Sequence, residues 1–347
     1  VLEELGRVAP EAADNVNELA AYAHNTAGSI MTTAFVGVPP EAKVWQAMAE
    51  VRRKSKNDSA ETISYVYAVA YGGQLVGVVS LRDLILAEPG QLVADVMTAS
   101  VVRVLDQSDR EEVARTLAKY DFHAIPVVDA SGKILGVITS DDVVDVIIEE
   151  ATEDAHKMGA VSPMEGGYFH TSLFSYWKGR VTWLVVLFLG GFLTASVMHR
   201  FQHDLERVIA LAVFIPLIIS TGGNAGSQSA TLVIRALAMA QVTPRDWVKV
   251  AGRELVVGIL LGLVVGVLGF ARAYFEGESV DGIMLGLTVS ISILAVVTVG
   301  SLLGSLLPLL IQRVGLDPAV SSTPFIASLS DVMGLLVYLG IARTLLG

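Results

Sequence analysis

The chain has 347 residues, a net charge of −11, 53% hydrophobic residues and no cysteine. The lack of cysteine excludes a disulfide framework and a thiolate metal site. The acidic charge argues against nucleic acid as a partner and favours cations. Residues 1–180 hold 15 Lys and Arg against 26 Asp and Glu, whereas residues 181–347 hold nine of each. The composition therefore predicts an acidic soluble part followed by an apolar part that lies in a membrane.

The acidic part contains an internal repeat. Residues 75–83 (LVGVVSLRD) match residues 134–142 (ILGVITSDD), and residues 29–32 (SIMT) match residues 95–98 (DVMT). Each copy predicts a strand, a glycine-containing turn, a second strand and a helix. This order resembles a pair of CBS modules, which are βαββα units that pack in tandem. The resemblance implies an α/β tandem CBS pair over residues 26–148, preceded by a residual N-terminal helical segment over residues 1–25.

The resemblance to CBS modules also implies a nucleotide site. In that family a Ser/Thr-x-x-Asp step often binds an adenosine ribose, and the ligand would be ATP or another adenosine nucleotide. The matching positions are Ser80, Asp83, Thr139 and Asp142. Many CBS modules bind no nucleotide and only dimerise, so both interpretations stay open.

An acidic connecting helix and linker are predicted over residues 149–177. Four acids at helical spacing form one stripe that begins in the second module, and two more flank it. These acids are Asp142, Asp145, Glu149 and Glu153, with Glu150 and Asp154 beside them. The stripe is either an ordinary solvated face or a sensor in which a divalent cation relieves the repulsion between like charges.

Residues 178–347 predict an all-α membrane domain of five transmembrane helices, because a bilayer core needs about 20 apolar residues per helix. The expected spans are about 181–198, 207–240, 250–271, 283–311 and 318–345. Pro216, Pro308 and Pro324 predict kinks or oblique packing in three of them. Gly258, Gly262 and Gly266 recur every four residues, which is typical of close helix packing, within the bundle or at a dimer seam.

The basic residues predict the orientation. They gather before the first span, between the second and third, and between the fourth and fifth; they are Lys178, Arg180, Arg235, Arg245, Lys249, Arg253 and Arg313. The connection after the third span carries acids instead. We therefore expect a multi-pass membrane protein with cytoplasmic N-terminal domains and an external C-terminus, which the family resemblance given below would place in the bacterial inner membrane.

Two features of the spans are polar. Asp331 lies in the last span, where a carboxylate costs about 2.5–3.5 kcal/mol on insertion scales and usually faces a polar pathway. The second span carries Gly223, Asn224 and Gln228 in a run of glycines, hydroxyls and amides. Such a run is expected to expose backbone carbonyls and to place oxygen ligands in an apolar helix. The structural alternative for Asp331 is an acid that hydrogen-bonds to Ser328 or Ser330. The structural alternative for the polar run is a helix–helix contact joined by amide hydrogen bonds.

The oxygen ligands favour a hard cation. One carboxylate per chain is too few for Ca²⁺, whereas Mg²⁺ keeps much of its water and accepts one or two carboxylates, as a two-fold axis would supply. No nucleotide-hydrolysis motif is found. A passive pathway suffices, because the membrane potential supplies about 2.3 kcal/mol per charge per 100 mV.

Taken together, the tandem CBS modules, the acidic helix, the five spans, the Gly-Gly-Asn-x-Gly-x-Gln run and the terminal Leu-Ser-Asp-Val-x-Gly resemble the MgtE family of magnesium transporters and channels. The resemblance implies a homodimer in the lipid bilayer with a pore between two membrane domains. Asp331 would bind hydrated Mg²⁺ with its two-fold mate, and Asn224, Gly223 and Ser328 would belong to the pore.

The same resemblance implies regulatory Mg²⁺ sites that close the pore. The matching acids are Asp317, Asp142, Asp145, Glu150, Glu153, Asp154, Asp109, Glu111 and Asp121. Family members commonly carry a helical N-terminal domain with further acidic sites, and only about 25 residues precede the first module here. We therefore expect closure to be weaker or to need more Mg²⁺.

The predicted function is import of Mg²⁺ down the membrane potential through a channel that cytosolic Mg²⁺ closes, and not enzymatic catalysis. One alternative is a less selective carrier of Co²⁺, Mn²⁺ or Ni²⁺, or a proton-coupled transporter that uses Asp331. Two others are an intramembrane enzyme with Asp331 as catalytic acid, and a membrane-tethered nucleotide sensor without transport.

Overall fold

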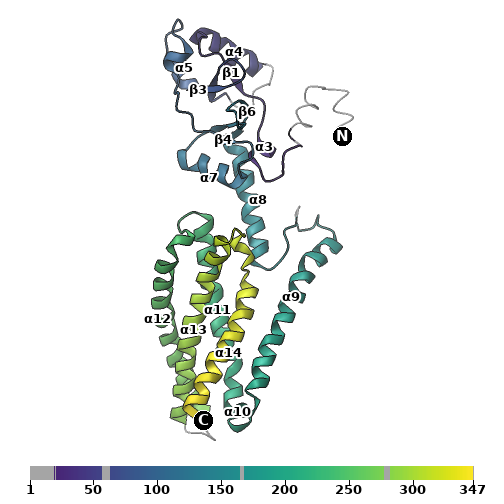
Figure 1. The fold of residues 1–347 in the computed structure, drawn as a ribbon, viewed down its shortest axis with the longest axis vertical. Helices are drawn as coiled ribbons and strands as arrows, with labels where there is room; N and C mark the ends of the chain where they lie inside the picture. The colour runs from purple at the N-terminus through teal and green to yellow at the C-terminus, as the bar shows by residue number, and fades with distance from the viewer. Residues whose placement is uncertain (1–18, 20, 57–62, 165–167, 277–281, 347) are drawn as a thin grey trace. The chain divides into compact units, whose positions relative to one another are not determined.

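The computed structural model describes residues 19, 21–56, 63–164, 168–276 and 282–346. It divides into two compact units, Val1–Ala151 and Thr152–Gly347. The predicted N-terminal helical segment, residues 1–25, lies almost wholly outside the described residues. The predicted fold class, a tandem α/β pair of modules followed by an all-α unit with five long apolar helices, is confirmed (Figure 1).

The first unit contains two three-stranded sheets with the same topology. The strands are β1 (Val36–Val38), β2 (Tyr65–Val69), β3 (Leu75–Ser80), β4 (Val104–Leu105), β5 (Ala124–Val128) and β6 (Ile134–Thr139). The helices are α3 (Ala27–Ile30), α4 (Val44–Lys56), α5 (Leu81–Leu86), α6 (Val93–Val96), α7 (Arg110–Tyr120) and α8 (Ser140–Met158). In each sheet the first strand pairs in parallel with the second, and the second forms an antiparallel hairpin with the third.

The two modules exchange their leading segments. Met31 follows α3 and packs in the core of the second module, whereas Met97 follows α6 and packs in the first. Each methionine covers a glycine of the repeated strand: a Cβ on Gly136 would lie 3.0 Å from the Met31 sulfur, and one on Gly77 would overlap Met97. The repeated sequence therefore encodes the contacts that join the modules.

The boundaries differ from those predicted. Helix α8 is continuous from Ser140 to Met158, so the predicted division between residues 148 and 149 falls inside it. The acidic stripe continues the last CBS helix and is not a separate connecting helix. Helix α9 begins at Leu173, five residues before the predicted start of the membrane domain, because the Ser172 side chain caps it by accepting a hydrogen bond from the Ser175 N–H.

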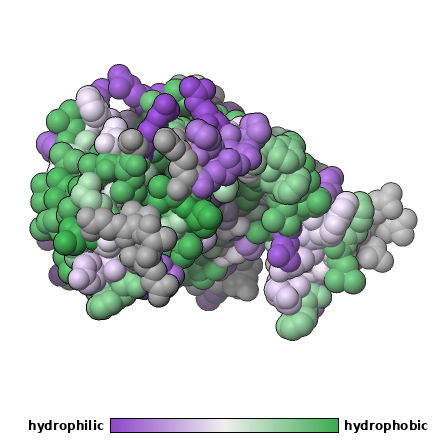
Figure 2. Space-filling view, turned by 90° about the horizontal axis from the view of Figure 1, so that it is seen from below, coloured by the Kyte–Doolittle hydropathy of each residue, from purple (hydrophilic) through white to green (hydrophobic). Residues whose placement is uncertain are grey.

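The second unit contains five helices long and apolar enough to cross a membrane, as predicted. They are α9 (Leu173–Arg200), α11 (Ala210–Ala238), α12 (Trp247–Glu276), α13 (Gly282–Arg313) and α14 (Thr323–Leu346). Shorter elements join them: α10 (Gln202–Arg207), and the 3₁₀ turns η1 (Pro244–Asp246) and η2 (Pro318–Val320). Figure 2 shows the molecule from below, where hydrophobic residues cover much of the face and hydrophilic residues lie among them. Many large apolar side chains of α9 and α12 are exposed, as expected for helices in contact with lipid.

The prolines play different parts. Pro216 and Pro308 lie inside α11 and α13. Pro324 does not kink the last span, because η2 ends before α14 begins at Thr323 and places Pro324 in the first turn. The missing N–H of proline costs nothing at that position.

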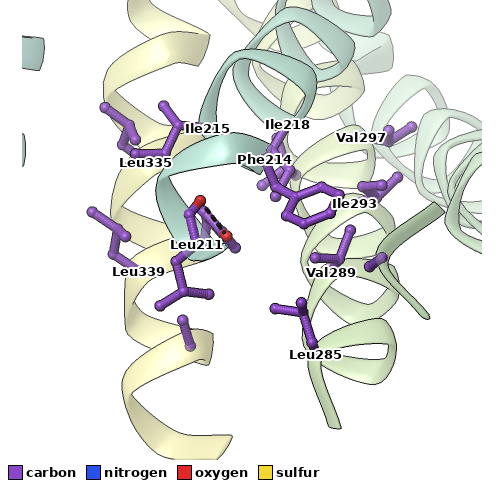
Figure 3. Close-up of a cluster of buried hydrophobic side chains, with 14 of the residues drawn as sticks. Leu211, Phe214, Ile215, Ile218, Leu285, Val289, Ile293, Val297, Leu335 and Leu339 are labelled. Carbon is purple, nitrogen blue, oxygen red and sulfur yellow. Dashed lines mark hydrogen bonds between the residues drawn. The ribbon is translucent and has the colours of Figure 1, made fainter. Parts of the chain in front are cut away.

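The main core of the bundle lies between α11, α13 and α14 (Figure 3). Phe214 and Ile218 of α11 face Ile293 of α13 in this cluster. The buried Tyr338 of α14 donates a hydrogen bond from its hydroxyl to the carbonyl oxygen of Leu211, at 2.9 Å. The phenol oxygen is thus satisfied without water in an apolar core.

The predicted glycine stripe packs α12 against α13. A Cβ on Gly258 would lie 2.9 Å from the Thr298 Cα, and one on Gly262 would lie 2.8 Å from the Leu294 Cα. A Cβ on Gly266 would likewise lie 3.1 Å from the carbonyl oxygen of Ser290. The stripe therefore packs within the bundle, one of the two locations considered from the sequence.

Candidate functional site

Asp331 is the main candidate in the membrane unit. It lies near the middle of α14 and is half-buried, and no hydrogen bond or ion pair holds its carboxylate within the described part of the chain. A Cβ built on Gly223 of α11 would lie 3.7 Å from Asp331 Oδ1. The structure therefore brings together two residues that are 108 positions apart in the sequence, beside Ala327 of α14, whose Cβ would lie 3.6 Å from the same built Cβ.

Ser328 and Ser330 do not brace Asp331. The Ser328 hydroxyl donates to the carbonyl oxygen of Pro324, one turn earlier in α14, at 3.1 Å. Ser330 is buried, and its oxygen has no hydrogen-bond partner within the described residues. The structural alternative for Asp331 is therefore wrong, and the carboxylate is left for a ligand or for water.

A polar stripe runs along α11 next to this acid. Ser220, Asn224, Gln228, Thr231 and Arg235 are all exposed, and their spacing of three or four residues places them on one helix face. An exposed polar stripe in a spanning helix is costly against lipid, so it faces water or another protein surface. The predicted Asn224 and Gln228 belong to it. Ser220 lies in the polar run that the sequence singled out, whereas Thr231 was missed, although its spacing was visible in the sequence.

The glycines of α11 divide between two neighbours. A Cβ on Gly222 would overlap Val296 of α13, and one on Gly226 would lie 3.0 Å both from the carbonyl oxygen of Gly300 in α13 and from Ile326 in α14. Gly223 faces α14 alone. Helix α11 is unbroken from Ala210 to Ala238, so its carbonyls stay within the helix ladder. The expectation that these glycines expose carbonyls is therefore wrong, and the helix-contact alternative explains Gly222 and Gly226.

A second carboxylate in a span was missed. Glu254 lies in the first part of α12, and the buried Ser229 of α11 donates a hydrogen bond to Glu254 Oε2 at 2.6 Å. Its position inside the predicted third span was a sufficient signal, but the neighbouring Arg253 made the region look like the end of a span. The described spans therefore hold a second partly buried acid beside the polar run of α11.

Asp317 and Glu153, two of the acids predicted to bind regulatory Mg²⁺, share a lysine. Lys157 Nζ lies 2.6 Å from Asp317 Oδ2 and 2.6 Å from Glu153 Oε1. Burial opposes the charged form of Lys157, but the hydrogen bonds to Asp317 and Glu153 outweigh it and raise its pKa above the ordinary value. A cation thus already sits between two acids that we predicted to share a regulatory ion.

Other predicted acids are held by an arginine of the second module. Arg110 of α7 is only 5% exposed, and it forms ion pairs of 2.8 Å with both Glu149 and Glu150 of α8. Burial disfavours the charge, whereas the bonds to Glu150 and Glu149 raise the pKa of Arg110. Glu150 is therefore a structural partner of Arg110 before any metal binds.

The remaining predicted acids have varied surroundings. Asp109 caps α7 by accepting from the Glu111 N–H at 2.8 Å, and Asp121 ends that helix in a left-handed conformation. Asp142 accepts a hydrogen bond from Thr139, whereas Asp145 is exposed. Among the residues described, no three His, Cys, Asp or Glu side chains converge as a metal site would require. The acids, Asp154 included, therefore do not form a complete metal site in a single chain.

A cavity of about 230 Å³ lies between the two modules of the first unit and is lined by residues of both. Ser80 and Asp83 line it and hydrogen-bond to each other at 2.6 Å, while Tyr65, Tyr67 and Phe122 supply aromatic walls. The hydroxyl oxygen of Tyr67 is buried and has no partner within the described residues. Thr139 and Asp142 do not line this cavity, although they form the equivalent pair at 2.6 Å. The predicted nucleotide residues thus fall into two separate pairs.

Comparisons with known proteins agree with this arrangement. A family model described as MgtE, divalent cation transporter, matches residues 215–341, and a CBS domain model matches residues 27–90 and 93–149. A protein of Thermus thermophilus named magnesium transporter MgtE is 44% identical over 337 residues, which cover 97% of this chain and 74% of that protein. The chain belongs to the MgtE family.

Further MgtE proteins extend the comparison. The magnesium transporter MgtE of Enterococcus faecalis is 39% identical over 96% of this chain and 72% of that protein. The magnesium transporter MgtE of Bacillus subtilis is 36% identical over 92% of this chain and 70% of that protein. Among solved structures, the soluble part of a magnesium transporter is 42% identical over 44% of this chain and 55% of that one, with a TM-score of 0.39. The cytosolic domain of the Mg²⁺ channel MgtE in complex with ATP is 39% identical over 42% and 62%, with a TM-score of 0.37.

Proposed function

We propose that this protein is a Mg²⁺-selective channel that imports Mg²⁺ down the membrane potential and that cytosolic Mg²⁺ closes. Three MgtE relatives that carry the name magnesium transporter support Mg²⁺ as the substrate. The observation that carries the proposal is the Asp331 carboxylate, which has no protein partner within the described residues and lies against Gly223. A hydrated Mg²⁺ needs only one or two carboxylates, so a single acid per chain is enough.

A homodimer would complete the pore. The polar stripe of α11 is exposed in a single chain, and two such stripes across a two-fold axis would line a water-filled path instead of facing lipid. Two Asp331 carboxylates brought close would repel each other unless a cation lies between them. In the proposed dimer the polar stripe of α11 and the Asp331 carboxylate therefore both line the ion pathway.

The proposed gate uses the acids around α8. In this chain Lys157 bridges Glu153 and Asp317, so a Mg²⁺ ion that binds these acids must displace the ammonium group. Asp142, Asp145, Glu150 and Asp154 would bind further ions, and Asp109, Glu111 and Asp121 would act in the second module. The positive-inside distribution of basic residues supports a cytoplasmic location for this sensor and an external C-terminus, in the inner membrane.

We further propose that the cavity between the two CBS modules, with Ser80 and Asp83 of the first module in its wall, binds an adenosine nucleotide. The cavity volume of about 230 Å³ lies below the roughly 300–1,000 Å³ of most small-molecule sites, so it fits a nucleoside with the phosphates outside. The aromatic walls suit a purine. The Tyr67 hydroxyl, which has no partner within the described residues, could hydrogen-bond to a polar group of the ligand.

A second candidate is a less selective divalent cation carrier. The family description names divalent cations in general, and a hydrated ion between two carboxylates leaves Mn²⁺, Co²⁺ and Ni²⁺ as competitors. A carrier that used Asp331 as its proton site would need a pH gradient, whereas a channel would not.

The test is ion flux through the full chain in liposomes, with Mg²⁺ varied separately on each side. We expect Mg²⁺ currents without a pH gradient, little current from Mn²⁺, Co²⁺ or Ni²⁺, and inhibition by Mg²⁺ on the side of the acidic unit only. Obligatory dependence on a proton gradient, or equal currents for all four ions, would favour the second candidate.

A further inference from the structure

Two neighbouring cavities lie at one end of the helical unit, outside the polar stripe. The first has a volume of about 520 Å³ and an apolar wall of α13 leucines, including Leu303 and Leu310, closed by Trp247 and Pro244. The second, of about 670 Å³, is lined by Thr243, Pro244, Arg245, Trp247, Gln312 and Arg313. Pro244, Trp247 and Arg313 line both, so the two cavities form one groove with an apolar and a polar end.

The polar end of this groove is basic. Arg245 and Arg313 are exposed, and neither forms an ion pair within the part of the chain that the structure describes. The nearest acid in sequence, Asp246, is already bonded to Lys249 at 3.0 Å and to the Thr243 hydroxyl at 2.8 Å. The buried Oε1 of Gln312 also lacks a hydrogen-bond partner within the described residues. The groove therefore offers two guanidinium groups for an anion and an amide oxygen for a hydroxyl donor.

The dimensions match one leaflet of a bilayer. The apolar lining runs along α13 from Val299 to Leu310, which is about 16 Å at 1.5 Å per residue. Half of a hydrocarbon core of roughly 30 Å is about 15 Å. The candidate spans end at Arg313 and begin at Pro244, so the arginines lie at headgroup level. Trp247 lines both cavities, and tryptophan is enriched at this depth.

We propose that this groove binds one anionic membrane phospholipid, with the phosphate at Arg245 and Arg313 and an acyl chain along α13. A free phosphate would use the arginines but leave the leucine wall empty. A zwitterionic lipid would fill the wall, but the cationic group of its headgroup would repel the two arginines and leave their charge uncompensated. The proposal is independent of the ion that the protein transports.

The test is lipid retention by the full chain, purified in detergent and delipidated. Phosphatidylglycerol, phosphatidylcholine and glycerol phosphate are added in turn, and binding is measured by native mass spectrometry. We expect one phosphatidylglycerol per chain, at least tenfold weaker binding of phosphatidylcholine, and no stable binding of glycerol phosphate.

Two variants separate the ends of the groove. The double variant Arg245→Gln/Arg313→Gln should bind phosphatidylglycerol at least tenfold more weakly. Leu303→Trp, which fills the apolar end and keeps both arginines, should also weaken it. The matched control is Arg200→Gln/Arg343→Gln, which removes two exposed charges at the ends of α9 and α14 and should leave binding unchanged.

Three outcomes would overturn the proposal. Equal retention by both arginine double variants would show non-specific attraction. Glycerol phosphate binding as tightly as the lipid would identify a free-anion site. A change in dimer fraction with Leu303→Trp, without any change in lipid binding, would assign the groove to a second copy of the chain.

Discussion

Lys157 shows how one side chain can set the sensitivity of the proposed gate. It bridges Asp317 and Glu153, two residues that would otherwise repel each other and attract a divalent ion. Its pKa is raised above the ordinary value near 10.5. The stability that this bridge contributes is therefore fully present below that ordinary value, and it is lost only as the pH rises through the higher pKa of the folded protein. Across physiological pH, Mg²⁺ competes with a charged ammonium group.

Removing this lysine should make closure easier. In Lys157→Met no ammonium group has to be displaced, so we expect the Mg²⁺ concentration for half-inhibition to fall by up to about fivefold, which corresponds to an exposed ion pair of about 1 kcal/mol. The measurement is Mg²⁺ flux in liposomes against Mg²⁺ on the side of the acidic unit. Lys249→Met, which removes a lysine paired with Asp246 alone, is the control. An unchanged threshold in Lys157→Met would place the regulatory ion elsewhere.

Ser229 tests the second carboxylate. Without its hydroxyl, the partly buried Glu254 loses its hydrogen bond, so Ser229→Ala should destabilise the protein by about 1–3 kcal/mol. Thermal unfolding in detergent measures this change. Thr231→Ala is the control, because the exposed Thr231 hydroxyl bonds only to a carbonyl of its own helix, at Ser227. Equal loss in both variants would mean that Glu254 has another partner.

At the scale of the element, the α12–α13 contact depends on the absence of side chains. A Cβ on Gly262 would lie 2.8 Å from the Leu294 Cα, so Gly262→Leu must push the helices apart. We expect a destabilisation of about 1–3 kcal/mol or more, seen as a lower unfolding temperature in detergent.

Gly252→Leu on the same helix is the matched control for this contact. A Cβ at Gly252 has no atom within 4 Å, so this variant should be neutral or slightly stabilising, because leucine favours the helix more than glycine does. If both variants unfolded alike, the stripe would not pack the bundle.

The sequence predicted elements better than it predicted their contacts. The five spans and both CBS modules followed from apolar length and from the repeat, which are local properties. Pro324 was assigned a kink because the turn at η2, which separates it from the preceding chain, has no hydrophobic signature. The α11 glycines were misjudged because only the packing against α13 shows which of them a neighbour fills.

The candidate site was predictable in part for the same reason. Asp331 and Asn224 stood out as polar residues in apolar runs, and the family resemblance named the acids of the sensor. The Lys157–Asp317 pair joins residues 160 positions apart, and no pattern in the sequence links them. Arg110 likewise looked like one more surface charge until burial placed it beside Glu149 and Glu150.

At the scale of the whole molecule, the second unit leaves polar groups unsatisfied in a single chain. The described residues offer Asp331 no partner, and the α11 stripe is exposed. A homodimer with a central aqueous path would satisfy both, and membership of the MgtE family makes ion transport the function to test. The central claim is therefore that Asp331 holds the permeating Mg²⁺.

The most direct measurement is Mg²⁺ flux through Asp331→Ala in liposomes, beside a control that removes one acid from a short helix of the same unit, Glu206→Gln. We predict that Asp331→Ala reduces flux to background while the protein remains a dimer by native mass spectrometry, and that Glu206→Gln conducts like the unmodified chain. Undiminished Mg²⁺ flux through a dimeric Asp331→Ala protein would contradict the account.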